Sequence, residues 1–386
     1  MRPRRPPAPA LDRPRPRPSR VPPKGPERGT RKGDPKGTEQ RGGGALRRSE
    51  APGLLLRPLP ATERLRIGRR DGSGGSGEGR GGGGGAGMGA GGAGGARGRG
   101  ARARARGAVR AVVTDVDGTL LDPRNALPAS AARAARELRA RGIPLILATG
   151  KTRGPWLPPL LEAIGPLGAP ALFAQGLLAY EADGTPLWER ALEPAFLRRC
   201  VRLARRLRDV QVVAYCGSRL VCAACDRHSA RLPDYGEPEP EAVGDLEEAL
   251  CGGGGRAPVA CQKLIFMADE PMAGVRAELA RELRDGEDCS LTSALPGMLE
   301  VLPVGASKGE AVARLLRDLG IRPEEVVALG DGENDVELLE LAGVGVAMGN
   351  ASPAAVRAAQ HQVAANDADG WAEAVDRFVL EGGRSG

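Results

Sequence analysis

The sequence contains no hydrophobic run that is long enough to cross a membrane. No stretch of the 386 residues approaches the roughly 18 consecutive apolar residues that a transmembrane helix requires. The apolar stretch at 54–56 is also too short for the core of a signal peptide. We therefore expect no membrane-spanning segment and no membrane partner.

The sequence also has little histidine, no aromatic residue in its first 155 positions, and cysteines in one region only. No Phe, Tyr or Trp precedes Trp156, and histidine occurs only at positions 228 and 361. The seven cysteines all lie between positions 200 and 289, and their odd number does not indicate a disulfide framework. A reducing compartment is the expected setting.

Residues 1–107 have a composition that cannot build a hydrophobic core. They are rich in arginine, proline and glycine, and they carry 26 Lys and Arg residues against 8 Asp and Glu residues. We expect this basic tail to be disordered. Residues 108–386 hold 30 basic and 40 acidic residues, so this part does not have the charge of a nucleic-acid-binding surface.

Three interpretations of the tail stay open. An organelle transit peptide is Arg-rich and poor in acidic residues, as this tail is, although the tail holds only four serines. A tail encoded by unselected GC-rich sequence, or by a wrongly assigned start codon, ranks close behind. An Arg/Gly-rich RNA-binding segment ranks third, because the tail lacks aromatic residues that would stack on bases.

The first strand-like segment after the tail ends in two aspartates. Residues 109–114 form a short apolar run that is typical of a buried strand, and Asp115, Asp117 and Gly118 follow it. Ligands bind at the carboxyl ends of strands in open α/β sheets. Two carboxylates this close repel each other unless a cation lies near them. Since Mg²⁺ binds carboxylates together with phosphate oxygens, we expect Mg²⁺ here.

Strand-like and helix-like segments alternate from residue 108 onward. A helix is predicted at about 129–141 and a second buried strand at 143–148. Repeated units of this kind predict an α/β fold with a parallel sheet. The Pro/Glu alternation at 237–241 is expected to be a loop, and the apolar segment 298–303 is expected to be the strand that returns the chain to the core.

Four motifs resemble those of the haloacid dehalogenase-like (HAD) hydrolases. They are, in chain order, the DxDGT pattern at 115–119, the strand end at 148–151, the helix start at 305–309 and the GDGxND pattern at 330–335. Ser307 is the expected N-cap of the helix that starts there. The segment at 173–180, with Gln175 where an asparagine is usual, is similar to plant and algal chloroplast members of the Cof-like subgroup.

The resemblance implies a Rossmann-like α/β core with a parallel sheet and an inserted α/β cap. The implied limits are a tail at 1–107, core segments at 108–176 and 296–386, and a cap at 177–295. It also implies a Mg²⁺-dependent phosphatase that acts on a small phosphorylated metabolite, with a sugar phosphate as the first guess. A chloroplast or another organelle is the implied location, with the cytoplasm as the alternative.

The resemblance also implies roles for individual residues. Asp115 attacks phosphorus to form an aspartyl-phosphate, and Asp117 protonates the leaving oxygen and then activates water. The implied metal-binding residues are Asp115, Asp117, Asp331 and Asp335. The implied phosphate-binding residues are Thr149, Gly150, Lys308 and Asn334. Lys151 and Arg153 are both candidates for contacting the substrate.

Two alternatives concern other functions. A non-catalytic or RNA-associated protein would have to bind nucleic acid through the basic tail. Some plant relatives carry this module beside a ribosomal-RNA-processing endoribonuclease domain, which needs a His-rich metal motif that two histidines do not provide.

Cys222 and Cys225, with His228 nearby, suggest zinc or redox chemistry, but no second such pair follows. We interpret them as buried or unreactive thiols, and no oligomeric state is predicted.

Overall fold

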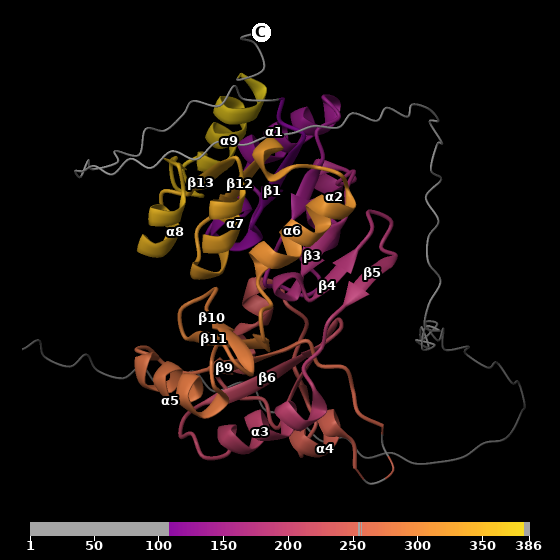
Figure 1. Ribbon diagram of the computed structural model, residues 1–386, viewed down its shortest axis with the longest axis vertical. Coiled ribbons are helices and arrows are strands. Elements are labelled where there is room, and N and C mark those ends of the chain that lie inside the picture. Colours follow the sequence, from indigo (N-terminus) through magenta and orange to yellow (C-terminus); the bar gives the residue numbers. More distant parts are fainter. Residues whose placement is uncertain (1–107, 254, 256, 382–386) are drawn as a thin grey trace, which may run out of the picture. The chain divides into compact units, whose positions relative to one another are not determined.

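The computed structural model describes residues 108–381 apart from 254 and 256 (Figure 1). The interpretations of the tail at 1–107 therefore lie outside the described residues. Among the described helices, none combines the length and the apolar character that crossing a bilayer requires. The described strands form three sheets, of five, six and three strands.

The five-stranded sheet is parallel throughout, with the strand order β14-β13-β12-β1-β2. Its strands are β1 (Ala111–Thr114), β2 (Leu145–Leu147), β12 (Val326–Gly330), β13 (Val344–Ala347) and β14 (His361–Gln362). The predicted α/β class and parallel sheet are confirmed. Strands β1 and β12 are neighbours although most of the described chain separates them in sequence.

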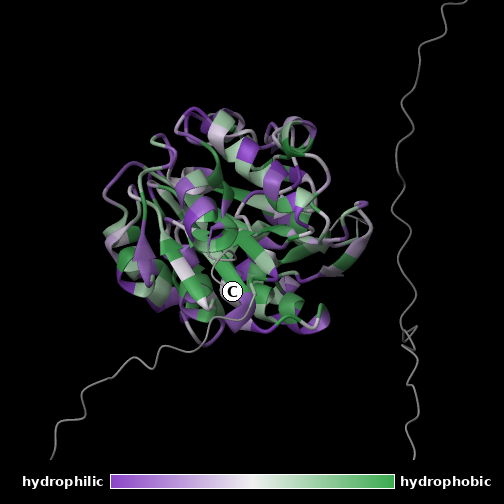
Figure 2. Ribbon diagram, turned by 90° about the horizontal axis from the view of Figure 1, so that it is seen from above, coloured by the Kyte–Doolittle hydropathy of each residue, from purple (hydrophilic) through white to green (hydrophobic). Residues whose placement is uncertain are grey.

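Helices cover both faces of this sheet because side chains alternate along each strand. Val112 packs with residues of α1, α2 and α9, whereas Val113 packs with residues of α6 and α7. The helix bounds are α1 (Ala129–Ala140), α2 (Leu157–Ile164), α6 (Lys308–Asp318), α7 (Val336–Leu341), α8 (Pro353–Ala358) and α9 (Gly370–Val375). In Figure 2 the central strands are mostly hydrophobic, and the helices around them alternate between polar and apolar residues.

The six-stranded sheet comes from the chain between β5 and α6 and has the order β10-β11-β9-β6-β7-β8. Its strands are β6 (Gln211–Cys216), β7 (Arg219–Cys222), β8 (Glu241–Ala242), β9 (Lys263–Met267), β10 (Cys289–Thr292) and β11 (Met298–Pro303). Helices α3 (Pro194–Ala204), α4 (Leu246–Cys251) and α5 (Ala273–Leu283) pack on one face, in a cluster with Val212 and Leu264. The opposite face holds Val213, Tyr215 and Ile265.

Strand β11 differs from the sequence-based expectation. It was expected to return the chain to the core, but it lies in the six-stranded sheet and pairs antiparallel with β9 and β10, for example through Leu299 and Phe266. All six of its residues are buried. A continuous buried run suits a central strand of either sheet, so its composition could not decide between them.

The third sheet is an antiparallel set of β3 (Ala171–Phe173), β4 (Leu178–Tyr180) and β5 (Pro186–Glu189). A parallel bridge between Ala148 and Leu172 connects β3 to the end of β2. This arrangement brings the turn at Ala174–Gly176, which includes Gln175, beside the carboxyl end of the parallel sheet.

Candidate active site

Asp115 and Asp331 follow two neighbouring parallel strands. Thr114 at the end of β1 is paired with Leu329 in β12, and the amide of Asp115 donates a hydrogen bond of 3.0 Å to the carbonyl of Leu329. The carboxyl ends of both strands therefore meet at one edge of the sheet. Asp331 follows Gly330, the last residue of β12, so the register of the two strands brings both carboxylates to this edge.

Lys308 is the first residue of α6 and lies beside these carboxylates. Ser307 caps the helix, as predicted, because its hydroxyl accepts a hydrogen bond of 3.0 Å from the amide of Glu310. The Lys308 ammonium lies 2.7 Å from Asp115 Oδ1 and 2.6 Å from Asp335 Oδ1. Burial alone would lower the pKa of Lys308, but these two carboxylates raise it, so the side chain stays charged.

Asp115, Asp331 and Asp335 form a cluster with the chemistry of a cation site. Their nearest carboxylate oxygens all lie within 4.8 Å of one another. Burial, together with the charge of Asp335, raises the pKa of Asp115 well above its usual range and that of Asp331 to about 7. One lysine does not balance two buried carboxylates and a half-buried third one, so a divalent cation fits here.

The two oxygens of Asp335 are already engaged. Oδ1 contacts Lys308, and Oδ2 accepts hydrogen bonds of 3.0 and 2.9 Å from the amides of Asp331 and Gly332. Asp115 and Asp331 are therefore better placed to bind a cation directly. We assign Asp335 the role of holding Lys308 and the Asp331 loop in position.

The turn after β1 depends on Gly118. Its φ of 71° lies in the left-handed region, and a Cβ atom there would collide with the carboxylate of Asp331. Asn350 donates a hydrogen bond of 2.8 Å to the Gly118 carbonyl and holds the turn from the other side. The turn thereby keeps Asp117 close to the cluster.

Asp117 pairs with Lys151, which follows the end of β2. The ammonium of Lys151 lies 2.6 Å from Asp117 Oδ1, and only 3% of the Lys151 side chain is exposed. Burial raises the pKa of Asp117, and the positive charge of Lys151 opposes this rise. Thr149 is buried, and its hydroxyl accepts a hydrogen bond of 3.1 Å from the Lys151 amide.

Arg153 lies apart from these residues. Its guanidinium lies 4.6 Å from the ring centroid of Tyr180 in β4, and it does not line the pocket described below. Of the two candidates for substrate contact, the structure brings Lys151 to the site and directs Arg153 toward the third sheet.

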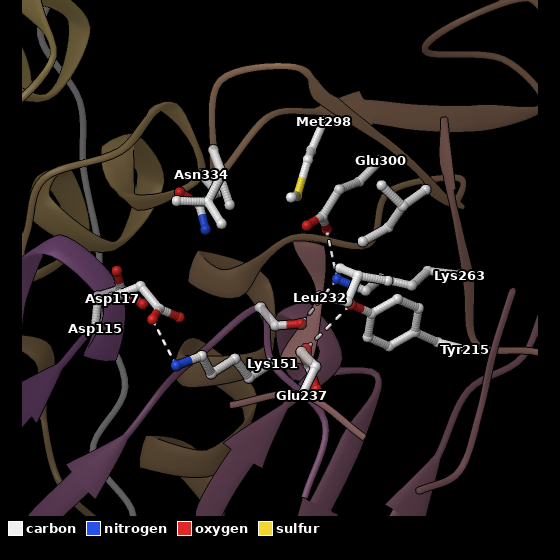
Figure 3. A pocket seen from close by; sticks show the side chains of 14 residues that line it. Asp115, Asp117, Lys151, Tyr215, Leu232, Glu237, Lys263, Met298, Glu300 and Asn334 are labelled. Atoms are coloured by element: carbon white, nitrogen blue, oxygen red, sulfur yellow. Dashed lines mark hydrogen bonds and ion pairs between the residues drawn. The ribbon is translucent and has the colours of Figure 1, made fainter. Parts of the chain in front are cut away.

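A pocket separates the strand ends from the face of the six-stranded sheet that lies opposite α3, α4 and α5 (Figure 3). Its catalytic end is lined by Asp115, Asp117, Gly150, Lys151 and Asn334. Its far end is lined by Tyr215, Leu232, Glu237, Lys263, Met298 and Glu300, among others. Its free volume is about 30 Å³, which is room for about two water molecules.

A chain of polar groups connects the two ends, and sequence reasoning missed two of its members, Lys263 and Glu300. Asn334 donates a hydrogen bond of 3.1 Å to Gln175 Oε1, and Gln175 Nε2 donates one of 2.9 Å to Glu300 Oε2. Lys263 lies 2.9 Å from the same Glu300 oxygen. A signal was present, because Lys263 and Glu300 are charged residues within otherwise apolar strands. Such residues are buried only when they are paired.

Glu237 was also missed, because the Pro/Glu alternation at 237–241 was interpreted only as a loop. Its carboxylate accepts a hydrogen bond of 3.0 Å from the Tyr215 hydroxyl and one of 3.2 Å from the Thr152 amide. Burial raises the pKa of Glu237 to about 7, while the charge of Lys263 acts in the opposite direction.

The Cys222 and Cys225 thiols lie 3.6 Å apart, with Cys222 buried and Cys225 exposed. None of the cysteines, all of which lie in the described part, forms a disulfide. Within 108–381, the groups of three or more His, Cys, Asp or Glu that could hold a metal do not include either of these two cysteines.

A parallel sheet with carboxylates at its strand ends and a buried lysine between them defines a class of hydrolase. The sequence pattern of the haloacid dehalogenase-like hydrolases matches residues 112–375, and the chain belongs to this family. The predicted membership is therefore confirmed. The chain is an enzyme of this superfamily, and several of its named relatives are phosphatases.

The relatives include proteins of different kinds. A chloroplastic endoribonuclease, YBEY of Arabidopsis thaliana, is 32% identical over 283 residues, which are 70% of this chain but 46% of that protein. The 5-amino-6-(5-phospho-D-ribitylamino)uracil phosphatase YcsE of Bacillus subtilis is 25% identical over 276 residues, or 70% and 96% of the two chains. A solved haloacid dehalogenase-like hydrolase from Bacteroides thetaiotaomicron aligns with a TM-score of 0.59 at 25% identity, and the alignment covers 70% of this chain and 99% of that one.

Proposed function

We propose that this protein is a Mg²⁺-dependent phosphomonoester hydrolase that acts on a small phosphometabolite, with a sugar phosphate as the first candidate. One observation carries the proposal. The Asp115 carboxylate lies 2.7 Å from a buried, charged Lys308 at the edge of a pocket, and Asp117 lines the same pocket. The phosphatases among the named relatives support the reaction class.

The reaction proceeds by two displacements at phosphorus. A carboxylate oxygen of Asp115 attacks, the bond to the leaving oxygen breaks, and Asp117 gives its proton to that oxygen. Asp117 then takes a proton from water, the water oxygen attacks the aspartyl-phosphate, and Asp115 and phosphate are released. Lys151 lies against Asp117 and favours its return to the ionised form between the two steps.

The remaining residues hold the phosphoryl group and its charge. Bound Mg²⁺, held by Asp115 and Asp331 with Asp335 in support, would neutralise charge on the phosphoryl oxygens. Thr149 and Asn334 offer neutral polar groups, and Lys308 offers a fixed positive charge. The backbone of Gly150 at the pocket wall completes the set.

The pocket must open before a phosphate ester can enter. Its free volume of about 30 Å³ is far below the several hundred Å³ of a typical small-molecule site. We propose that the six-stranded sheet acts as a cap that moves away from the strand ends and then closes to exclude water.

Hydrolysis of a panel of phosphate esters by the full chain, with and without Mg²⁺, tests the proposal. We expect hydrolysis that requires the metal and that falls by at least about 10³-fold in the Asp115→Asn variant. Equal activity in that variant, or no hydrolysis of any ester by folded protein, would refute the proposed reaction.

We propose an organelle location, because the chain is similar to a protein named as chloroplastic. A fluorescent protein fused behind residues 1–107 tests this proposal in plant cells. Fluorescence confined to plastids is the expected result, and diffuse cytoplasmic fluorescence would contradict it.

A further inference from the structure

The cations that line the pocket are both paired with carboxylates. Among the pocket-lining residues, all of them in the described part, Lys151 and Lys263 carry positive charge. Each ammonium already has a carboxylate partner. Lys151 lies 2.6 Å from Asp117, and Lys263 lies 2.9 Å from Glu300.

Lys263 has its three N–H groups directed at the protein. It donates a hydrogen bond of 2.8 Å to the carbonyl of Gly150 and pairs with Glu300 Oε2. Its ammonium also lies 4.4 Å from the ring centroid of Tyr215, where it gains a cation–π contact. With three partners and 1% exposure, Lys263 has no donor left for a ligand.

Carboxylate oxygens, in contrast, are available at this end. Both contacts of Glu300 are made by Oε2, and Oε1 takes part in neither. Glu237 and Glu300 both line the pocket and are at most 5% exposed. Hydroxyl groups of a ligand can donate to such oxygens, whereas a carboxylate or a second phosphate would be repelled by them in a poorly solvated site.

Apolar side chains complete this end. Leu232, Ile265 and Met298 line the pocket and offer contacts to a carbon skeleton. A ligand that combines a short carbon chain with several hydroxyl groups therefore matches the wall better than one with a second anion.

We propose that Glu237 and Glu300 make this pocket selective for a neutral, polyhydroxylated leaving group and reject a leaving group that carries a second anionic group. The proposal rests on the phosphatase function proposed above, and it assigns the chemical class of the alcohol that is released. Glu300 has a second role in this selectivity. Its ion pair with Lys263 neutralises the lysine and prevents it from attracting an anionic substrate.

A matched pair of esters tests the selectivity. Sorbitol 6-phosphate and 6-phosphogluconate have the same open six-carbon chain, and they differ at the end that is a CH₂OH group in one and a carboxylate in the other. With full-length protein and Mg²⁺, at a pH of about 8.5 so that Glu237 is ionised, we expect kcat/KM to be at least about tenfold higher for sorbitol 6-phosphate. Glu300→Gln should reduce this ratio by about tenfold, mainly through faster hydrolysis of 6-phosphogluconate by a site in which Lys263 has lost its anionic partner.

Two further variants make the test specific. Glu237→Gln removes the other carboxylate and should also lower the ratio of the two kcat/KM values. This variant replaces Glu300→Gln in the test if circular dichroism shows that the Glu300→Gln protein is unfolded. Glu239→Gln is the matched control, because Glu239 is exposed and does not line the pocket. It should leave the ratio unchanged.

Hydrolysis of p-nitrophenyl phosphate separates the two possible failures. If this hydrolysis depends on Asp115 but the ratio is one or lower, the selectivity proposal is wrong and the phosphatase proposal stands. The same holds if both glutamine variants keep the wild-type ratio. If no Asp115-dependent hydrolysis of any of the three esters occurs, the phosphatase proposal fails, and the selectivity proposal fails with it.

Discussion

Lys308, beside the catalytic end of the pocket, and Lys263, at its far end, are both buried, but they have different surroundings. Lys308 lies between two carboxylates, with a third from Asp331 close by, so negative charge remains in excess. Lys263 has one carboxylate, one carbonyl and one aromatic ring, and its donors are used up. The comparison indicates that the catalytic end needs a cation to complete it, whereas the far end offers a ligand only hydrogen bonds and apolar contact.

Removing Lys308 should have the largest effect. Lys308→Met would leave Asp115 and Asp335 buried without their shared cation, so we expect a loss of about 5 kcal/mol in the free energy of unfolding and loss of hydrolysis. Urea unfolding and ester hydrolysis measure the two effects. Arg357→Met, at an exposed position of α8, is the control and should change neither. A Lys308→Met protein of wild-type stability would show that the buried charges are compensated otherwise.

Removing Lys263 should have a smaller effect. Lys263→Met leaves one buried carboxylate, Glu300, which keeps the hydrogen bond from Gln175, so we expect a loss of about 3 kcal/mol in the free energy of unfolding. Exchanging both charged partners, in Lys263→Met with Glu300→Leu, should recover most of this loss because no unpaired charge remains. Urea unfolding at one pH measures both. Equal losses in the single and the double variant would show that packing, rather than charge, dominates at this end.

The pH dependence of stability can sharpen the comparison at Glu237. The pKa of Glu237 rises from 4.5 to about 7 on folding, so the folded state holds a proton that the unfolded state has lost between these pH values. Stability should therefore fall as the pH rises from 4.5 to 7, by up to about 3 kcal/mol, and level off above. Glutamine does not titrate, so Glu237→Gln removes this contribution. The free energy of unfolding of the variant minus that of wild type should therefore rise as the pH rises from 4.5 to 7. A gain that does not vary with pH would contradict the burial argument.

The catalytic end was predictable because its residues follow strands. Asp115, Thr149 and Asp331 each come one or two residues after an apolar run, and parallel strands bring such positions together whatever their separation in sequence. The helix start that Ser307 caps was predictable from the residues, and the resemblance implied the role of Lys308 there. Local patterns and one topological rule were sufficient for Asp115, whereas the roles of Thr149, Lys308 and Asp331 were implied by the resemblance to the haloacid dehalogenase-like hydrolases.

The far end could not be predicted in the same way. Tyr215, Lys263 and Glu300 lie on three strands of one sheet face, and their meeting depends on the order and register of those strands. No spacing in the sequence encodes that register. Arg153 illustrates the same limit, because sequence placed it two residues from Lys151, and only the position of Tyr180 shows that it turns away.

The smallest effect is expected at an exposed ion pair outside the pocket, between α5 and the segment that follows β12. Arg276 in α5 contacts Glu333, next to Asn334, at 2.5 and 3.1 Å, and both side chains are about 40% exposed. Because the pair joins the proposed cap to the strand ends, Arg276→Ala should favour the open pocket. We expect KM to rise by no more than about fivefold, or about 1 kcal/mol, with little change in kcat.

Salt and a matched variant decide whether this ion pair holds the pocket closed. At an ionic strength of about 1 M the exposed pair is screened, so wild type and Arg276→Ala should then have the same KM. Arg284 pairs with Glu287 and Asp288 in the loop that leads to β10, so Arg284→Ala breaks an exposed ion pair without affecting the connection to the strand ends. If Arg284→Ala raises KM as much as Arg276→Ala does, closure depends on the overall charge of this region, and the Arg276–Glu333 contact has no special role.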